Sequence, residues 1–129
     1  MAALKKLLSR FGKAKPGVLV VDDDEDVRMM LRAMLNNEDF GDVWDAPDGE
    51  TAIALAYQHE PKLIILDYMM PNMDGEAVAK AIRGFLPSSR IVVLSGVLME
   101  QPDWADMFLK KTDITRLIPV LSLERASSE

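Results

Sequence analysis

Three short runs of apolar residues constrain the fold more than any other feature of the sequence. They occupy residues 18–21 (VLVV), 62–66 (KLIIL) and 90–94 (RIVVL). Their apolar residues are consecutive rather than alternate, which is typical of strands that are buried on both faces. The segments between the runs carry apolar residues at helical spacing. Strands that alternate with helices predict βαβ units and a parallel α/β sheet.

The rest of the chain supplies the remaining elements of this pattern. Two shorter strands are expected at residues 42–46 (DVWDA) and 107–110 (MFLK). Helices are expected in residues 27–35, 47–59, 74–86 and 113–121, with a further helix between residues 95 and 111. The sequence therefore predicts five strands and five helices in one domain, and 129 residues can bury a core of that size.

Composition excludes several classes of function. The chain has no cysteine, which excludes disulfides, thiolate metal sites and cysteine nucleophiles and favours a cytoplasmic location. A single histidine excludes a zinc site with several histidines, and a net charge of −6 argues against nucleic-acid binding. No apolar run approaches the roughly 20 residues of a membrane span, and the first residues do not resemble a secretory signal.

Polar residues stand where the predicted strands end. In chain order they are Asp22 and Asp23, Asp67, Ser95, and the pair Lys110 and Lys111. Parallel strands end at the same edge of a sheet, where the chemistry of such folds is usually found. We therefore expect three carboxylates, a hydroxyl and an ammonium group to converge.

The acidic run from Asp22 to Asp26 needs a source of charge compensation. Two unit charges about 4 Å apart repel by roughly 4 kcal/mol near a protein surface. Magnesium prefers oxygen ligands and would neutralise Asp22 and Asp23, whereas residues 24–26 are expected in solvent or at a helix N-terminus. The alternative is that the whole run is only a helix-start signal; the polar residues at the other strand ends argue against it.

Four motifs resemble the receiver domain of two-component response regulators. They are VLVVDDDEDVR, LIILDYMMPNMDG, IVVLSG and FLKK, and the resemblance covers residues 18–121. It implies a flavodoxin-like, doubly wound sheet of five parallel strands in the order 2-1-3-4-5, with helices on both faces.

The same resemblance implies a role for each matching residue. Asp67 would be the phosphoacceptor. Asp22 and Asp23 would bind Mg2+ together with Asp67 and the backbone carbonyl of Met69, with Mn2+ as the alternative ion.

Three further residues have implied roles. Lys111 would pair with the phosphoryl oxygens; Lys110 is the alternative, but Lys111 keeps the family's spacing from the aromatic residue. Ser95 would bond a phosphoryl oxygen, and Phe108 would be the switch aromatic whose rotamer follows Ser95.

The sequence departs from the family pattern near its end. Only 15 residues separate Ser95 from Lys111 and they include Pro102, so the fourth helix is expected to be short or irregular. Thr112 stands where the family usually has proline, and Pro119 should kink or end the last helix. In the family this surface commonly handles output, so we expect a remodelled output face beside an intact phosphorylation site.

Residues 1–16 differ in character from the rest of the chain. They carry five basic residues and no acidic one, and the apolar residues Leu4, Leu7, Leu8 and Phe11 recur at helical spacing. We predict that this basic amphipathic segment packs on a partner or on its own domain; contact with a membrane is the less favoured alternative. The predicted division is residues 1–16, a receiver domain at 17–123, and a tail at 124–129.

The leading hypothesis is a single-domain response regulator without a DNA-binding output module. A histidine kinase or a histidine phosphotransfer protein would phosphorylate Asp67 and so change the contact with an unknown downstream protein. Such a chain assists only its own phosphoryl transfer and dephosphorylation. The alternatives are a phosphorylation-independent interaction module and a Mg-dependent phosphohydrolase with Asp22 and Asp24 as its acids.

Overall fold

The computed structural model describes residues 16–37, 40–70 and 74–113. Its strands are β1 (Val18–Val21), β2 (Val43–Ala46), β3 (Leu63–Asp67), β4 (Arg90–Ser95) and β5 (Met107–Lys110). Its helices are α2 (Glu25–Asn37), α3 (Gly49–His59) and α4 (Gly75–Arg83). Among the described residues, no helix is both long and apolar enough to cross a membrane.

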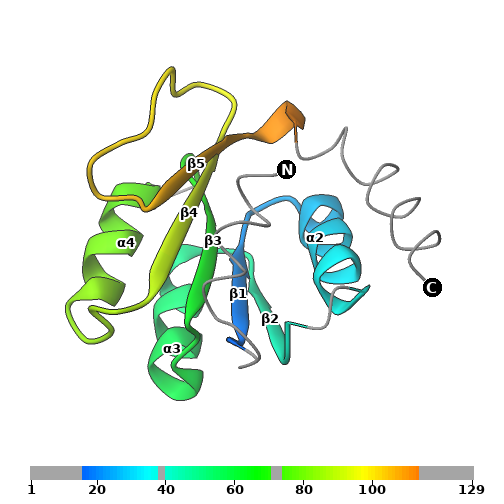
Figure 1. Ribbon diagram of the computed structural model, residues 1–129, viewed down its shortest axis with the longest axis vertical. Helices are drawn as coiled ribbons and strands as arrows, with labels where there is room; N and C mark the ends of the chain where they lie inside the picture. Colours follow the sequence, from blue (N-terminus) through cyan, green and yellow to red (C-terminus); the bar gives the residue numbers. More distant parts are fainter. Residues whose placement is uncertain (1–15, 38–39, 71–73, 114–129) are drawn as a thin grey trace.

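The five strands form one parallel sheet in the order β2-β1-β3-β4-β5. Helices α3 and α4 cover one face of the sheet and α2 lies on the other (Figure 1). The predicted doubly wound fold and strand order are therefore confirmed. The register pairs Val21 with Leu66 and Ser95 with Lys110, so the carboxyl ends of neighbouring strands lie at one edge.

Strand β1 shows why consecutive apolar residues are needed. Val18 and Val20 belong to the core cluster on the α2 side of the sheet. Leu19 and Val21 belong to the cluster that packs against α3 and α4. Each fully buried side chain contributes about 1.5–3 kcal/mol relative to an exposed one, so both faces of the strand stabilise the fold.

Helices α3 and α4 begin at the turn residues that the sequence places before them. The carboxylate of Asp48 accepts a hydrogen bond from the Thr51 amide at 2.7 Å, and that of Asp74 accepts one from the Ala77 amide at 2.9 Å. These N-caps satisfy amides that the helices cannot pair internally.

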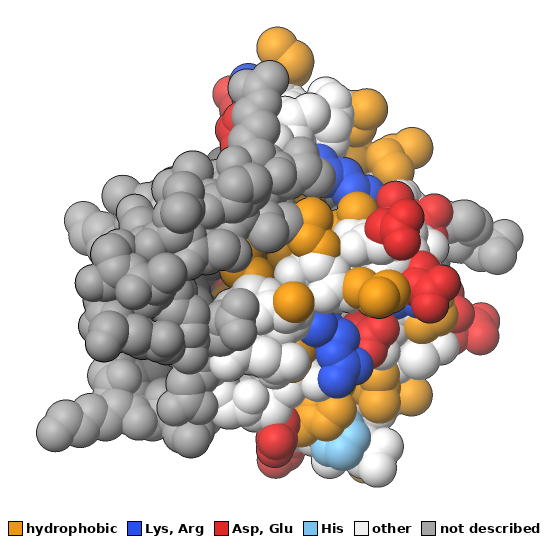
Figure 2. Space-filling model, turned by 90° about the vertical axis from the view of Figure 1, so that its right-hand side faces the viewer, with side chains coloured by type: hydrophobic (Ala, Val, Ile, Leu, Met, Phe, Trp, Pro, Cys, Tyr) orange, Lys and Arg blue, Asp and Glu red, His pale blue; other side chains and the backbone are white. Residues whose placement is uncertain are grey.

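Ion pairs join α2 to the edge strand β2. Arg28 and Arg32, one helical turn apart, both bind the carboxylate of Asp45. On the side of the molecule where α2 lies, basic side chains sit directly beside acidic ones (Figure 2).

The connection between β4 and β5 contains no helix. Residues 96–106 are all described, and they form bends and a single turn at residues 103–104. The fourth helix, predicted to be short or irregular, is thus reduced to an irregular segment, and the count of five helices was wrong at this point. Pro102 begins the turn, since its carbonyl accepts a hydrogen bond from the Ala105 amide at 3.2 Å.

Trp104 takes over part of the covering role of the missing helix. It packs against the core cluster on the α3 and α4 side, and its ring stacks on Tyr68 with centroids 6.3 Å apart. The Trp104 ring therefore covers part of the apolar core on the α3 and α4 side of the sheet.

Several predictions about the chain ends lie outside the described residues. Residues 1–15, the helix expected at 114–121 and the tail at 124–129 belong to this group. Lys111–Asp113 already form a helical turn directly after β5. None of the described peptide bonds is cis.

The close approach of α4 to the end of β3 predicts an effect of substitution at Gly75. A Cβ atom there would lie 2.8 Å from the Asp67 carbonyl oxygen and 2.9 Å from the Tyr68 Cα, and both contacts are with backbone. We expect Gly75→Ala to lower the free energy of unfolding by about 1–3 kcal/mol, measured by urea denaturation. Gly96→Ala is the matched control, because a Cβ at Gly96 meets nothing within 4 Å. Equal stability of the two variants would contradict this packing.

Candidate phosphoacceptor and metal site

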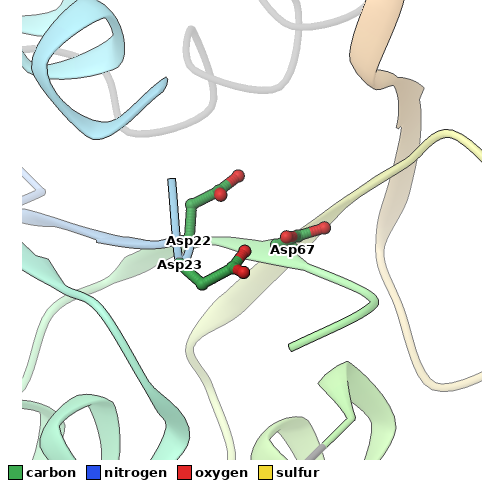
Figure 3. Close-up of side chains that lie close together, drawn as sticks. All are labelled: Asp22, Asp23 and Asp67. Carbon is green, nitrogen blue, oxygen red and sulfur yellow. The ribbon is translucent and has the colours of Figure 1, made fainter. Parts of the chain in front are cut away.

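Three carboxylates meet at the carboxyl edge of the sheet. Asp22 and Asp23 follow β1 directly, and Asp67 is the last residue of the neighbouring strand β3. Figure 3 shows the three side chains close together at these strand ends. One carboxylate oxygen from each lies within 4.8 Å of the others. The convergence predicted for these three residues is present in the structure.

The three carboxylates differ in their exposure. Asp22 is 0% exposed and Asp67 is 4% exposed, whereas Asp23 is exposed to solvent. Two of the three charges are therefore held in a poorly hydrated place, where ionisation needs a partner.

Lys111 is the cationic partner of both buried carboxylates. Its Nζ lies 3.0 Å from Asp22 Oδ2 and 3.2 Å from Asp67 Oδ2. Lys111 also donates a hydrogen bond to Asp22 Oδ1 at 3.3 Å. Lys110, the alternative that the sequence left open, has an exposed side chain.

The pKa values of the two buried acids, Asp67 and Asp22, are raised. The pKa of Asp67 rises from 3.8 to about 6, first because of burial and then because of the charge on Asp22, and Lys111 opposes the rise. Burial also raises the pKa of Asp22, although the hydrogen bond from the Asp24 amide and the contact with Lys111 both act to lower it. Burial alone would lower the pKa of Lys111, but its contacts with Asp22 and Asp67 outweigh burial and raise it.

The donor set fits a hard divalent cation. Oδ2 of Asp22 is buried and accepts no hydrogen bond of good geometry, although Lys111 Nζ lies 3.0 Å away. Three carboxylates facing one ammonium group leave excess negative charge, and the exposed side of Asp23 leaves an approach from solvent. Oxygen ligands with retained waters are what Mg2+ prefers in proteins.

Met69 lies two residues after Asp67, in the loop before α4. Its side chain is exposed, and its backbone N–H lies against the Asp67 carboxylate and lowers the pKa of that group. The loop backbone thus runs beside the carboxylate cluster.

Ser95 and Phe108 lie near the same edge of the sheet. Ser95 is buried at the end of β4, and its Oγ accepts hydrogen bonds from the amides of Val97 and Leu98, both at 3.0 Å. Phe108 is half-buried on β5, where it pairs with Val93. In this structure the Ser95 hydroxyl therefore stabilises the conformation of the loop that follows β4.

Sequence reasoning missed one residue that contacts this region. Arg28 donates a hydrogen bond from Nη1 to the Asp22 carbonyl oxygen at 2.8 Å. The available signal was a basic residue near the start of a helix, where the helix dipole disfavours a cation. A cation at this position implies a specific partner.

Comparison with protein families gives one match that spans most of the chain. The model of the family described as "Response regulator receiver domain" matches residues 18–118.

Curated relatives match this chain over part of their own length. A "Probable transcriptional regulator ycf27" of Galdieria sulphuraria is 37% identical over 71 residues, which are 55% of this chain and 28% of that protein. The "Sensor histidine kinase TmoS" of Ectopseudomonas mendocina is 34% identical over 96 residues, 74% of this chain and 10% of that protein. The chain therefore spans less than a third of these relatives.

Solved structures share the fold over nearly their whole length. The chemotaxis protein CheY4 of Vibrio cholerae is 28% identical with a TM-score of 0.68, covering 84% of this chain and 98% of that one. The response regulator TrrA of Thermotoga maritima, solved in complex with Mg2+ and BeF, is 28% identical with a TM-score of 0.67, covering 81% and 97%.

The raised pKa of Asp67 predicts how stability depends on pH in metal-free buffer. Well below pH 3.8 the Asp67 carboxyl is protonated in both the folded and the unfolded chain. Its contribution to the free energy of unfolding is then at its most favourable. As the pH rises towards about 6 and beyond, the folded chain must ionise a buried group, and that contribution is lost. Asp67→Asn should therefore match wild type near pH 4 and exceed its free energy of unfolding by about 2–3 kcal/mol at pH 8.

Urea denaturation of both proteins across this pH range measures the difference. A difference that stays constant between pH 4 and pH 8 would contradict a raised pKa for Asp67.

Proposed function

The chain belongs to the family of response regulator receiver domains, as its motifs suggested, and from this premise we propose that it is a phosphoacceptor of a two-component or phosphorelay system. Asp67 receives a phosphoryl group from a histidine kinase or a histidine phosphotransfer protein. The observation that carries the proposal is the convergence of Asp67 with Asp22, Asp23 and Lys111 at one sheet edge.

The proposed cofactor is Mg2+, with Mn2+ as an alternative. Its ligands are the carboxylates of Asp22, Asp23 and Asp67 and the backbone carbonyl of Met69. When bound, the cation offsets the repulsion between a carboxylate nucleophile and an anionic phosphoryl donor. The structure of the relative TrrA in complex with Mg2+ and BeF supports this choice of cation.

Asp67 is the nucleophile in the proposed transfer. A pKa of about 6 leaves most of its carboxylate ionised at neutral pH. One carboxylate oxygen attacks phosphorus in line; a P–O bond forms, the P–N bond to the donor histidine breaks, and the electron pair leaves with the imidazole nitrogen. Lys111 lies within 3.2 Å of Asp67 and pairs with a phosphoryl oxygen in the proposed product.

Ser95 links the proposed phosphorylation to a change in the surface. A hydroxyl that turns towards a phosphoryl oxygen gives up its bonds to the amides of Val97 and Leu98. Those two residues open the irregular connection to β5, which carries Phe108 as the proposed switch aromatic. Phosphorylation of Asp67 would thus alter the contact that this connection makes with a downstream protein.

The remaining predictions about the chain stay proposals. We place the receiver domain at residues 17–123, between the basic segment 1–16 and the tail 124–129, and the reaction in the cytoplasm. The chain assists its own phosphoryl transfer and dephosphorylation and turns over no other substrate.

Phosphorylation by a small donor tests the proposed function. Incubation with acetyl phosphate and Mg2+ should add one acid-stable, base-labile phosphoryl group to the wild-type protein, detected by mass spectrometry of the intact chain. Asp67→Asn should take up none, because the nucleophile is absent, and a chelator should prevent uptake by the wild type. Asp103→Asn is the matched control and should be phosphorylated like the wild type, because Asp103 is exposed in the turn between β4 and β5.

Two results would contradict the proposal. Absence of uptake by folded wild type would favour a phosphorylation-independent interaction module. Turnover of a phosphate ester that survives Asp67→Asn would favour the phosphohydrolase alternative.

A further inference from the structure

Arg28 connects the acidic site to the edge strand of the sheet. Its Nη1 donates to the Asp22 carbonyl oxygen at 2.8 Å, and its Nε donates to Asp45 Oδ2 on β2 at 3.0 Å. The Arg28 side chain is 14% exposed. The planar guanidinium group can hold two acceptors in a fixed relative position, which a lysine ammonium group does less well.

Both the N–H group and the carbonyl group of Asp22 form hydrogen bonds that link its backbone, directly or through Arg28, to β2. Its N–H donates to the Ala46 carbonyl oxygen at 3.1 Å. Its carbonyl oxygen accepts from Arg28, which is anchored on the neighbouring residue Asp45. That carbonyl belongs to the peptide group joining Asp22 to Asp23, so the orientation of this peptide sets the direction in which Asp23 leaves the chain.

The loop that follows β1 also determines which carboxylate oxygen of Asp22 is available to bind a cation. Oδ1 accepts the Asp24 amide at 2.9 Å, whereas Oδ2 is buried without a hydrogen bond of good geometry. A rotation of the Asp22–Asp23 peptide group would disturb this division and the position of Asp23 together.

We propose that Arg28 is a positioning residue that fixes the Asp22–Asp23 peptide group, and hence both carboxylates, for binding of a divalent cation. The proposal rests on the proposed function, because it concerns the same metal site. Groups that orient metal ligands without binding the metal themselves typically change metal affinity by about 10–100-fold when they are removed.

The chain offers a matched control for this role. Arg32 lies on the same helix, one turn further along, and binds the other carboxylate oxygen of Asp45. Its side chain is 42% exposed. Arg32 thus shares with Arg28 its charge, its helix and its partner on β2, while the contact with the Asp22 carbonyl belongs to Arg28.

Charge and positioning predict opposite changes in metal affinity. Removal of a cation near three carboxylates strengthens their attraction for Mg2+ if only charge matters. Loss of the hydrogen bond to the Asp22 carbonyl weakens Mg2+ binding if ligand orientation matters. The sign of the change in Arg28→Gln therefore separates the two effects.

Isothermal titration with MgCl2 alone, at constant ionic strength, tests the inference. We expect Arg28→Gln to raise the dissociation constant for Mg2+ by about tenfold or more, and Arg32→Gln to leave it within about twofold of wild type. Arg28→Lys keeps the charge but not the two-acceptor geometry, and it should weaken binding to an intermediate extent. Circular dichroism melting shows whether each variant is folded; should Arg28→Gln not fold, Arg28→Lys against wild type gives the deciding comparison.

The outcomes separate this inference from the proposed function. Wild-type binding of Mg2+ together with equal or tighter binding by folded Arg28→Gln would overturn the positioning role alone. A similar loss of affinity in Arg28→Gln and Arg32→Gln would also overturn it, because the effect would then follow from the shared pair with Asp45. A wild-type protein that binds no Mg2+ would overturn the proposed function and this inference with it.

Discussion

The two buried carboxylates of Asp22 and Asp67 share one ammonium group, that of Lys111. Asp22 and Asp67 would each cost several kcal/mol to bury as unpaired charges. Lys111 contacts both, although it lies 89 and 44 residues away from them in the sequence. Only a sheet that places β1 and β3 side by side, with β5 ending at the same edge, brings these groups together. The charge balance of the site therefore depends on the strand order of the sheet.

The site keeps its geometry although the connection between β4 and β5 has lost its helix, because other contacts anchor that connection. Asp106 Oδ2 accepts hydrogen bonds from the Ile91 amide and from Arg83 Nη2, both at 2.8 Å. The start of β5 is thereby fixed to β4 and α4 by a carboxylate. Pairing of Ser95 with Lys110 then places Lys111 at the site without help from a covering helix. The connection between β4 and β5 can therefore be irregular while the carboxylates and Lys111 at the end of the sheet keep their arrangement.

What the sequence could predict follows the range of the interactions involved. The buried runs identified β1, β3 and β4, and parallel strands require that Asp22, Asp23 and Asp67 converge with a lysine at the end of β5. Pattern and topology left Lys110 and Lys111 as alternatives, and the family resemblance favoured Lys111. The bond from Arg28 to the Asp22 carbonyl could not be predicted, because it depends on how α2 crosses the sheet beside Asp45. The stacking of His59 on Trp44, with ring centroids 4.5 Å apart, likewise depends on how α3 packs beside β2. The sequence pattern could not predict side-chain contacts that depend on helix packing, because such contacts do not follow from the strand order.

We propose that the carboxylate cluster forms a divalent-cation site at the carboxyl edge of the sheet. A titration of the 15N-labelled protein with Mg2+, followed by amide chemical shifts, tests it most directly. Binding at this site should give saturable changes with a single dissociation constant, confined to the amides around Asp22, Asp23, Asp67, Met69 and Lys111. Unchanged shifts at these amides at saturating millimolar Mg2+, or changes spread evenly over the exposed acidic residues of the surface, would contradict it.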